Sequence, residues 1–269
     1  MTPEPLSVLI TGATGNLGGK LRAHFEAAGR YDLRLLCLNG TNDPAVTTVD
    51  LSEPEENWGH HFDGVDVVLH FAADSSAKAG LASVQRNNID ATLNVFHAAV
   101  AHNVRRVVFA SSNWTMAGYR FGPARLTTSM APRPVGAYGL SKLICEWIGE
   151  SFSRSNNLSV ICLRIGFCPP PGEALMNHNK WEQQMWISDR DFLQLVDRAI
   201  EVPDIRFAVV NSVSNNPGMP WDLSETRSLL GYVPEDGRSI ELTPKGRARE
   251  VLDRVAHRVR GGGDFLMIT

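Results

Sequence analysis

A short apolar strand that runs directly into a glycine-rich turn constrains this chain more than any other sequence feature. The apolar residues 8–10 are followed at once by the turn Thr11-Gly12-Ala13-Thr14-Gly15-Asn16-Leu17-Gly18. In such a turn Gly12 permits the sharp bend, Gly15 lets the backbone approach a ligand, and Gly18 lets the next helix pack against the strand. The amides at the start of that helix add donors and positive potential for an anion. The turn therefore predicts a pyrophosphate site for NAD or NADP, formed by Gly12, Thr14, Gly15, Asn16, Leu17 and Gly18.

The rest of the chain alternates short apolar runs with segments of helical period, which is typical of βαβ units and a parallel sheet. The continuous apolar character of the runs suits strands that helices cover on both faces. We predict strands at residues 7–11, 33–38, 65–71, 107–111, 160–165 and 207–210. We predict helices over 15–28, around 89–100 and 143–148, and from an N-cap at Ser188 onward. The expected fold is α/β: a Rossmann, doubly wound parallel sheet.

The sequence changes in character after residue 166. A proline run at 168–172 cannot continue a strand or a helix, and residues 177–186 and 211–220 are polar or rich in turn-forming residues. In open α/β sheets, such excursions after the later strands lie beside the ligand. We therefore expect a dinucleotide-binding domain at 1–166, to which residues 188–211 return. Residues 167–187 and 212–269 are expected to form a small C-terminal substrate-side lobe and tail.

Composition argues against several classes of function. With 43% hydrophobic residues the chain can bury a large core, and its formal net charge of -3 offers no basic field for nucleic acid or a membrane surface. The N-terminus lacks the pattern of a signal peptide, and no apolar run is long enough to cross a membrane. The cysteines form no close pair, so we expect free thiols and a cytoplasmic protein. His60-His61 has no second cluster at ligand spacing, so a solvated loop pair is favoured over a metal site, and no metal is expected.

Tyr138 and Lys142 form a YxxxK pair whose chemistry follows from its spacing. Residues four apart on a helix share one face, so the Lys142 ammonium can lie near the Tyr138 phenol. A phenol has a pKa near ~10, and a neighbouring cation favours the phenolate, which brings the pKa toward the working pH. Such a base can take a hydroxyl proton while hydride leaves the same carbon. Ser112, at the end of a predicted strand, can donate a hydrogen bond to the substrate oxygen.

Together these motifs resemble the extended short-chain dehydrogenase/reductase family, also called the NAD-dependent epimerase/dehydratase family. The glycine spacing is GxxGxxG, and residues 6–170 carry the other motifs in the family's order. The resemblance implies that Tyr138 is the acid/base, that Lys142 tunes it and anchors the ribose, and that Ser112 is the oxyanion donor. Further cofactor contacts are implied for Asp50-Leu51 at the adenine, for Phe71-Ala72-Ala73 beside the ribose, and for Asn88 and Ile165.

The sequence leaves the choice between NAD and NADP open. The second strand of such folds commonly ends in an acidic residue in NAD enzymes, or is followed by Arg in NADP enzymes. Here the strand ends in Leu36-Cys37-Leu38-Asn39-Gly40, with neither. Asn39 could bond the ribose diol or tolerate a phosphate.

Within the family, residues 106–118 look most like uronate dehydrogenases and related short sugar dehydrogenases. Those enzymes have Ser-Ser-Asn-His where this chain has Ser111-Ser112-Asn113-Trp114, and Arg-Ile-Gly-Ser-Cys where it has Arg164-Ile165-Gly166-Phe167-Cys168. By this resemblance Ser75 and Asn113 orient the substrate. Trp114, Phe167 and Met176 stand where the relatives have polar groups, and Met176 replaces an Arg that holds a carboxylate, a pairing that Met cannot make. We expect a less polar substrate than a hexuronic acid, unless the alignment slips across the proline run and another residue serves.

The leading hypothesis is an NAD(P)-dependent oxidoreductase that transfers hydride between nicotinamide and a secondary alcohol or carbonyl of a small sugar-like or partly apolar molecule. The alternative is an NAD-dependent epimerase or dehydratase that recycles its cofactor within one turnover. A non-catalytic NAD(P) sensor is disfavoured, because such proteins usually lack the Tyr138–Lys142 pair. The resemblance also implies a homodimer, formed through helices around Ile89–Val100 and Leu143–Phe152.

Overall fold

A seven-stranded parallel sheet forms the centre of the molecule. The computed structural model describes residues 5–76 and 79–259, and within them the strands follow the order β3-β2-β1-β4-β5-β6-β7. The strands are β1 (Leu6–Thr11), β2 (Tyr31–Cys37), β3 (Val46–Thr48), β4 (Val67–His70), β5 (Arg106–Ser112), β6 (Ser159–Ile165) and β7 (Phe207–Ser212). Every predicted strand is present, and the expected Rossmann-type α/β fold is confirmed.

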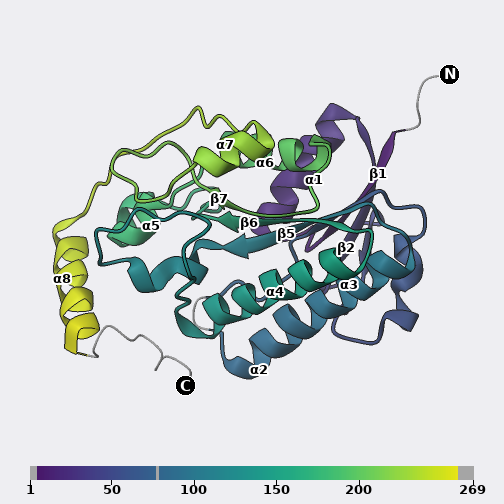
Figure 1. Cartoon of the computed structure of the whole chain (residues 1–269), viewed down its shortest axis with the longest axis horizontal. Coiled ribbons are helices and arrows are strands. Elements are labelled where there is room, and N and C mark those ends of the chain that lie inside the picture. Colours follow the sequence, from purple (N-terminus) through teal and green to yellow (C-terminus); the bar gives the residue numbers. More distant parts are fainter. Residues whose placement is uncertain (1–4, 77–78, 260–269) are drawn as a thin grey trace.

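Helices cover both faces of this sheet (Figure 1). One face carries α1 (Asn16–Ala28), α6 (Asp189–Glu201) and α7 (Ser224–Leu230), and the other carries α2 (Leu81–Val84), α3 (Ala91–Ala101) and α4 (Gly136–Ser155). The remaining helices, α5 (Lys180–Gln184) and α8 (Pro244–Val259), lie together at one end of the molecule. Short 3-10 helices occur at Glu55–Asn57, Gly59–Phe62, Asn113–Tyr119 and Leu175–Asn177, and a π-helical turn, Gln85–Asp90, joins α2 to α3. No helix among the described residues is long and apolar enough to cross a membrane.

The core is divided into two layers by the sheet. Successive residues of β1 face opposite sides, so Ile10 packs in the same cluster as Phe25 of α1, whereas Leu9 packs in the cluster of Phe96 of α3. All four side chains are fully buried. This arrangement explains why the strands are apolar throughout rather than alternating in polarity.

The direction of strand addition reverses at β1. The chain builds outward through β2 and β3, then crosses to the other side of β1 to begin β4, so that Thr11 pairs with both Leu36 and His70. His70 holds this end in place: its Nδ1 lies 2.8 Å from Thr11 Oγ1 and its Nε2 lies 3.0 Å from Thr92 Oγ1. Burial lowers the pKa of His70 to about 3, so the ring is neutral. Ligands of open α/β sheets bind beyond the carboxyl ends of the strands at such a reversal.

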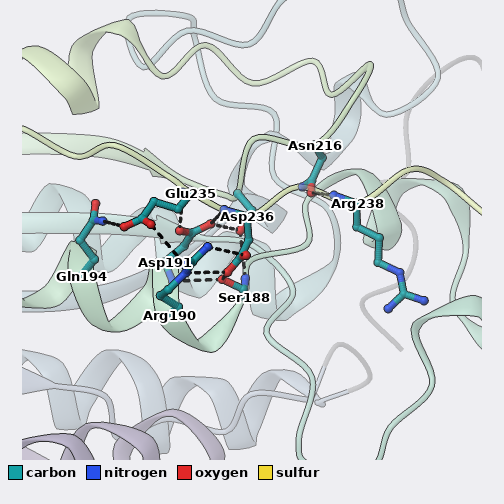
Figure 2. A network of polar contacts seen from close by, with 9 residues as sticks. Ser188, Arg190, Asp191, Gln194, Asn216, Glu235, Asp236 and Arg238 are labelled. Carbon is teal, nitrogen blue, oxygen red and sulfur yellow. Dashed lines mark hydrogen bonds and ion pairs between the residues drawn. The ribbon is translucent and has the colours of Figure 1, made fainter.

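The start of α6 is fastened to the chain that follows β7. Ser188 caps α6 as predicted, with its Oγ accepting from the Asp191 amide at 3.0 Å. Asp191 is fully buried, and its carboxylate accepts from the Glu235 amide at 2.8 Å and from Ser214 Oγ at 2.5 Å. The Ser188 hydroxyl in turn donates to Asp236 at 2.6 Å (Figure 2). These bonds hold residues far beyond β7 against the first turn of α6.

Candidate active site

A cavity of about 670 Å³ opens at the carboxyl ends of the central strands. It gathers residues from separate elements, as expected for a ligand site in this kind of fold. From the predicted cofactor residues its wall contains Gly12, Thr14, Gly15, Asn16, Leu17, Gly18, Asn39, Asp50, Leu51, Phe71, Ala72, Ala73, Tyr138 and Ile165. From the predicted substrate residues it contains Ser75, Ser112, Trp114 and Phe167.

The glycine-rich turn is packed too closely for side chains at two of its positions. Gly12 has a φ of +69°, and a Cβ there would lie 2.8 Å from the Ala72 amide nitrogen. A Cβ on Gly18 would lie 2.1 Å from the Gly12 carbonyl oxygen. Helix α1 begins directly after Gly15 with no side-chain cap, so the amides of its first turn remain available to a ligand. The residues present therefore fit a dinucleotide diphosphate.

Asp50 and Asn39 line another part of the cavity, and the Asp50 carboxylate is already engaged by protein groups. Its Oδ1 accepts from the Ser52 hydroxyl at 2.6 Å, and its Oδ2 pairs with Arg86 at 2.8 Å. The hydrogen bonds from Ser52, together with the nearby Arg86, lower the pKa of Asp50. The carboxylate therefore stays charged and can still accept a hydrogen bond from an amine on a ligand.

The three predicted catalytic residues meet where β5 ends and α4 begins. Ser112 is the last residue of β5, and its side chain lies close enough to that of Tyr138 in the first turn of α4 to affect its pKa. Lys142 is buried behind them and donates from Nζ to the Ala110 carbonyl oxygen at 2.8 Å. Desolvation lowers the pKa of Lys142 to about 8. The Ser112 and Tyr138 hydroxyls can therefore both form a hydrogen bond with one substrate oxygen. The titratable amine of Lys142 lies close behind them.

The pKa of Tyr138 differs from the sequence-based expectation. It is raised to about 12, mainly by desolvation; the interaction with Ser112 opposes this rise and the charge of Asp74 adds to it. The Lys142 ammonium is directed elsewhere: its Nζ lies 4.9 Å from the centre of the Phe109 ring and 5.8 Å from that of Tyr138. Desolvation dominates this pKa and Lys142 does not lower it, so the predicted shift is wrong for this structure and the phenol is protonated at neutral pH.

Asn88, Asn113, Lys142 and Met176 do not belong to the cavity wall. Asn88 supports the wall from behind, because its side chain accepts from the Asp74 amide at 2.8 Å and donates to the Asp74 carbonyl at 3.2 Å. Asn113 is fully buried, and neither atom of its amide group has a hydrogen-bond partner in the described part of the chain. The strand ends at Ser112 and a helical turn begins at Asn113, and this turn buries Asn113 while Ser112 lines the cavity. Met176 is 42% exposed and lies outside the cavity.

The cavity wall also holds residues that the sequence reasoning did not single out, above all Asp74 and Cys168. Asp74 directly follows Phe71-Ala72-Ala73, the segment expected beside the ribose. That position was the one sequence signal that could have identified Asp74 as a site residue. The carboxylate accepts from Ser83 Oγ at 2.5 Å. Cys168 lies 3.3 Å from Lys20, which also pairs with Asp189 at 2.6 Å. These contacts join α1 to the chain after β6. The two segments are far apart in the sequence, so no local pattern reveals the contact.

Comparison with known proteins agrees with this geometry. Residues 8–177 match the model of the NAD dependent epimerase/dehydratase family. The chain belongs to this family. It is 34% identical to an NAD-dependent glucose-6-phosphate dehydrogenase from Haloferax volcanii, over 89% of this chain and 96% of that protein. It is also 32% identical to an L-arabinose 1-dehydrogenase (NAD(P)(+)) of the same organism, over 85% of this chain and 96% of that protein.

Solved structures of uronate dehydrogenase share the fold along nearly the whole chain. The enzyme from Agrobacterium tumefaciens matches with a TM-score of 0.77 and 29% identity, covering 92% of this chain and 89% of its own. A variant of that enzyme complexed with NAD matches with a TM-score of 0.77 and 28% identity. The expectation of an NAD(P)-dependent oxidoreductase is confirmed by these relatives, which support it over the epimerase alternative.

Proposed function

We propose that this chain is a dehydrogenase of a small, uncharged, sugar-like molecule, acting at a secondary alcohol or the corresponding carbonyl. The observation that carries the proposal is the placement of Ser112 and Tyr138 together in the cavity wall, with Lys142 buried close behind them. The hydroxyl pair provides a donor for the substrate oxygen and a group that exchanges its proton. The sugar dehydrogenases among the relatives support this assignment.

The protein groups divide the proton chemistry between them. A dinucleotide held by the glycine-rich turn would supply the hydride acceptor in its oxidised form. Ser112 donates a hydrogen bond to the substrate oxygen and holds it beside Tyr138. In the oxidising direction Tyr138 takes the hydroxyl proton, and in the reducing direction it returns a proton to the carbonyl oxygen. Because the pKa of Tyr138 is about 12, its resting form is the proton donor.

The charge of the cavity favours an uncharged substrate. Asp50 and Asp74 belong to its wall, and among the described residues no Lys or Arg side chain does. A carboxylate or phosphate on the substrate would find no cation to pair with at the wall, and Asp74 would repel it. Trp114 and Phe167 add apolar surface at the same end. L-Arabinose, named for one relative, has this neutral character, whereas glucose 6-phosphate and uronates do not.

The same charge distribution favours NAD over NADP. The additional phosphate of NADP carries negative charge and is usually met by an Arg near the end of the second strand. Here Asn39 is exposed at that position and no described Lys or Arg lines the cavity. We expect NAD to bind at least about tenfold more tightly than NADP, a difference of about 1.4 kcal/mol. Titration of the protein fluorescence with each cofactor measures the ratio.

Substitution of Tyr138 by Phe tests the catalytic assignment. Tyr138→Phe removes the proton-exchanging hydroxyl and keeps the ring, so kcat should fall by about 10²–10⁴-fold while the Kd for NAD changes little. Tyr31→Phe, which deletes a hydroxyl at the start of β2 and outside the cavity wall, is the matched control and should keep full activity. Retained turnover in Tyr138→Phe would refute the assignment.

A cofactor-reduction screen identifies the substrate class and the reaction type together. Aldoses, uronates, cyclitols and hydroxy-lactones are each tested with NAD and with NADP. We expect net NADH formation with an uncharged aldose or lactol and little with a uronate. Net NADH from a single substrate also excludes an epimerase, because internal recycling leaves no reduced cofactor behind.

We also propose that the chain forms a homodimer through the helices predicted from the resemblance. On that face the side chains of Leu81 in α2, Leu93 in α3 and Trp147 in α4 are 53%, 36% and 55% exposed. Large exposed apolar side chains grouped on neighbouring helices favour a subunit interface. Trp147→Glu should therefore shift the protein to a monomer in sedimentation velocity experiments, and an unchanged sedimentation coefficient would contradict the interface.

Two broader expectations remain proposals. We infer a cytoplasmic location, because Cys37, Cys145, Cys162 and Cys168 are all free thiols. We also keep the division into a dinucleotide-binding domain at 1–166 and a substrate-side lobe at 167–187 and 212–269, of which residues 260–269 lie outside the described part of the chain. The β-bridge between Phe167 and Trp186 supports the first of these excursions as a unit.

A further inference from the structure

A second cavity, of about 840 Å³, lies apart from the cofactor cavity and shares no lining residue with it. Its wall is formed by residues 119–125 after β5, by α5 after β6, by residues 215–227 after β7, and by one residue of α8. Five of the lining side chains are cationic and none is acidic: Arg120, Arg125, Lys180, Arg227 and Arg254. The whole chain has a formal net charge of -3, so this gathering of cations runs against the overall charge.

Ion pairing does not neutralise this cavity. Arg125 pairs with Asp222 at 2.9 Å and Arg254 pairs with Glu250 at 3.2 Å. Lys180 and Arg227 form no ion pair within the described residues. At least these two cations therefore lack a counter-charge at the cavity wall. A cleft lined by one sign of charge concentrates its field on whatever enters it.

The cations are also held close to one another. The guanidinium groups of Arg120 and Arg254 lie 4.7 Å and 5.6 Å from the centre of the same ring, that of Phe121. Stacking on an aromatic ring stabilises a cation without neutralising it. The Phe121 ring therefore brings two of the five lining cations close to each other.

Two tryptophans of the same wall carry indole N–H groups that are buried and have no partner within the described residues. Trp181 of α5 and Trp221 before α7 are 4% and 3% exposed, and their ring centres lie 4.6 Å apart. Neither indole N–H has a hydrogen-bond acceptor in the described structure. Buried donors normally have a hydrogen-bond partner. The lack of acceptors here accompanies the excess of cations at the same wall. The cations of the wall are what makes it complementary to an oxygen-rich anion.

We propose that this cavity is a second ligand site, and that it binds a small molecule carrying phosphate. One Arg guanidinium can form two parallel hydrogen bonds with phosphate oxygens, and Lys binds phosphate as a point charge. The cations that line the cavity therefore suit phosphate well. The volume lies within the range of small-molecule sites. The residues that line it differ from those of the catalytic cavity, so a phosphate-bearing ligand here is independent of the uncharged substrate proposed above.

Calorimetric titration with inorganic pyrophosphate tests the proposal. The protein is kept saturated with NAD at low salt, which occupies the glycine-rich turn of the other cavity. We expect wild-type protein to bind pyrophosphate, and Lys180→Gln combined with Arg227→Gln to weaken binding by about tenfold or more, since two charges are lost. Arg105→Gln removes one positive charge at the amino end of β5, far from the cavity wall, and should leave the affinity unchanged.

Thermal unfolding supplies the second readout. A ligand that binds only the folded state raises the unfolding temperature, so pyrophosphate should stabilise the wild-type protein and the Arg105 variant but not the double variant. The double variant without ligand should unfold at the wild-type temperature, which shows that it is folded. No binding by the wild-type protein, equal binding by the double variant, or equal loss in the Arg105 variant would each overturn the proposal.

Discussion

Glu146→Gln is expected to destabilise this protein far more than the same substitution one helical turn further along α4. Glu146 pairs with Arg164 of β6 at 2.8 Å, and both side chains are 3% exposed. The carboxylate also accepts from the Ser111 hydroxyl at 2.5 Å. Glu150 pairs with Arg154 at 2.6 Å, but those two side chains are 34% and 76% exposed. The two pairs share residue types and distance, and differ in burial.

The expected magnitudes follow from what each substitution leaves behind. Removing one partner of a buried pair strands the other charge in a medium of low dielectric constant, which costs about 3–5 kcal/mol. An exposed ion pair contributes about 0–1 kcal/mol, because water solvates either partner alone. The free energy of unfolding of a protein is typically about 5–15 kcal/mol, so Glu146→Gln should remove a large share of it. Glu150→Gln should fall within about 1 kcal/mol of the wild-type value.

Guanidinium denaturation, followed by far-UV circular dichroism, measures both changes on the same protein. A third variant separates charge from packing. Glu146→Leu combined with Arg164→Met removes both charges while filling the space, and should recover most of the loss. Equal free energies of unfolding for Glu146→Gln and Glu150→Gln would refute the reasoning. So would a double variant no more stable than Glu146→Gln alone.

Two further predictions concern the cofactor turn and the response to acid. Gly18→Ala should raise the Kd for NAD at least about tenfold, because a Cβ there would lie 2.1 Å from the Gly12 carbonyl oxygen, whereas Gly19→Ala, with no atom nearer than 3.9 Å, should leave it unchanged; fluorescence titration compares them. His70 has a folded pKa of about 3, below its ordinary value of 6.5, so only the unfolded chain takes up its proton as the pH falls between these values. The free energy of unfolding should therefore decline in acid, and His70→Gln should reduce the decline measured by urea unfolding between about pH 7.5 and about pH 5; an unchanged decline would contradict the role of His70.

Features specified by a few neighbouring residues could be predicted from the sequence. The glycine-rich turn needs one strand, three glycines and one helix, and all lie within residues 6–28. The N-cap at Ser188 needs only the amide of Asp191, three residues on. Local steric and hydrogen-bonding rules govern both features, so no distant contact had to be known.

Features that depend on rotation of the backbone could not be predicted in the same way. The segment around Ile89 carries a helical pattern of apolar residues, but the structure enters α3 through a π-helical turn at Gln85–Asp90. The extra residue in that turn changes which side chains face the sheet, and a period of 3.6 residues does not reveal it. Likewise, the resemblance placed both Asn113 and Trp114 beside the substrate, because it does not reveal the change from strand to helical turn at Asn113. The structure buries Asn113 and places Trp114 in the wall.

Long-range features remained out of reach for a different reason. The second cavity is assembled from residues 119–125, α5, residues 215–227 and α8, which meet only because the excursions after successive parallel strands lie at the same edge of the sheet. Each of these segments contributes only one or two cations to the wall, so no single segment is marked as a site. Their common sign becomes meaningful once the fold brings them to one wall.

Helix α4 ties catalysis to stability. It carries Tyr138, Lys142 and Glu146 at four-residue intervals, so the three side chains lie on one face of the helix. The first lines the cavity, the second donates to the Ala110 carbonyl of β5, and the third pairs with Arg164 of β6. The two deeper contacts fix the rotation and depth of the helix against the sheet, and thereby place the Tyr138 hydroxyl at Ser112. A substitution that leaves the catalytic residues intact but releases Glu146 should therefore lower kcat as well as stability, because the helix that aims Tyr138 would lose its buried anchor.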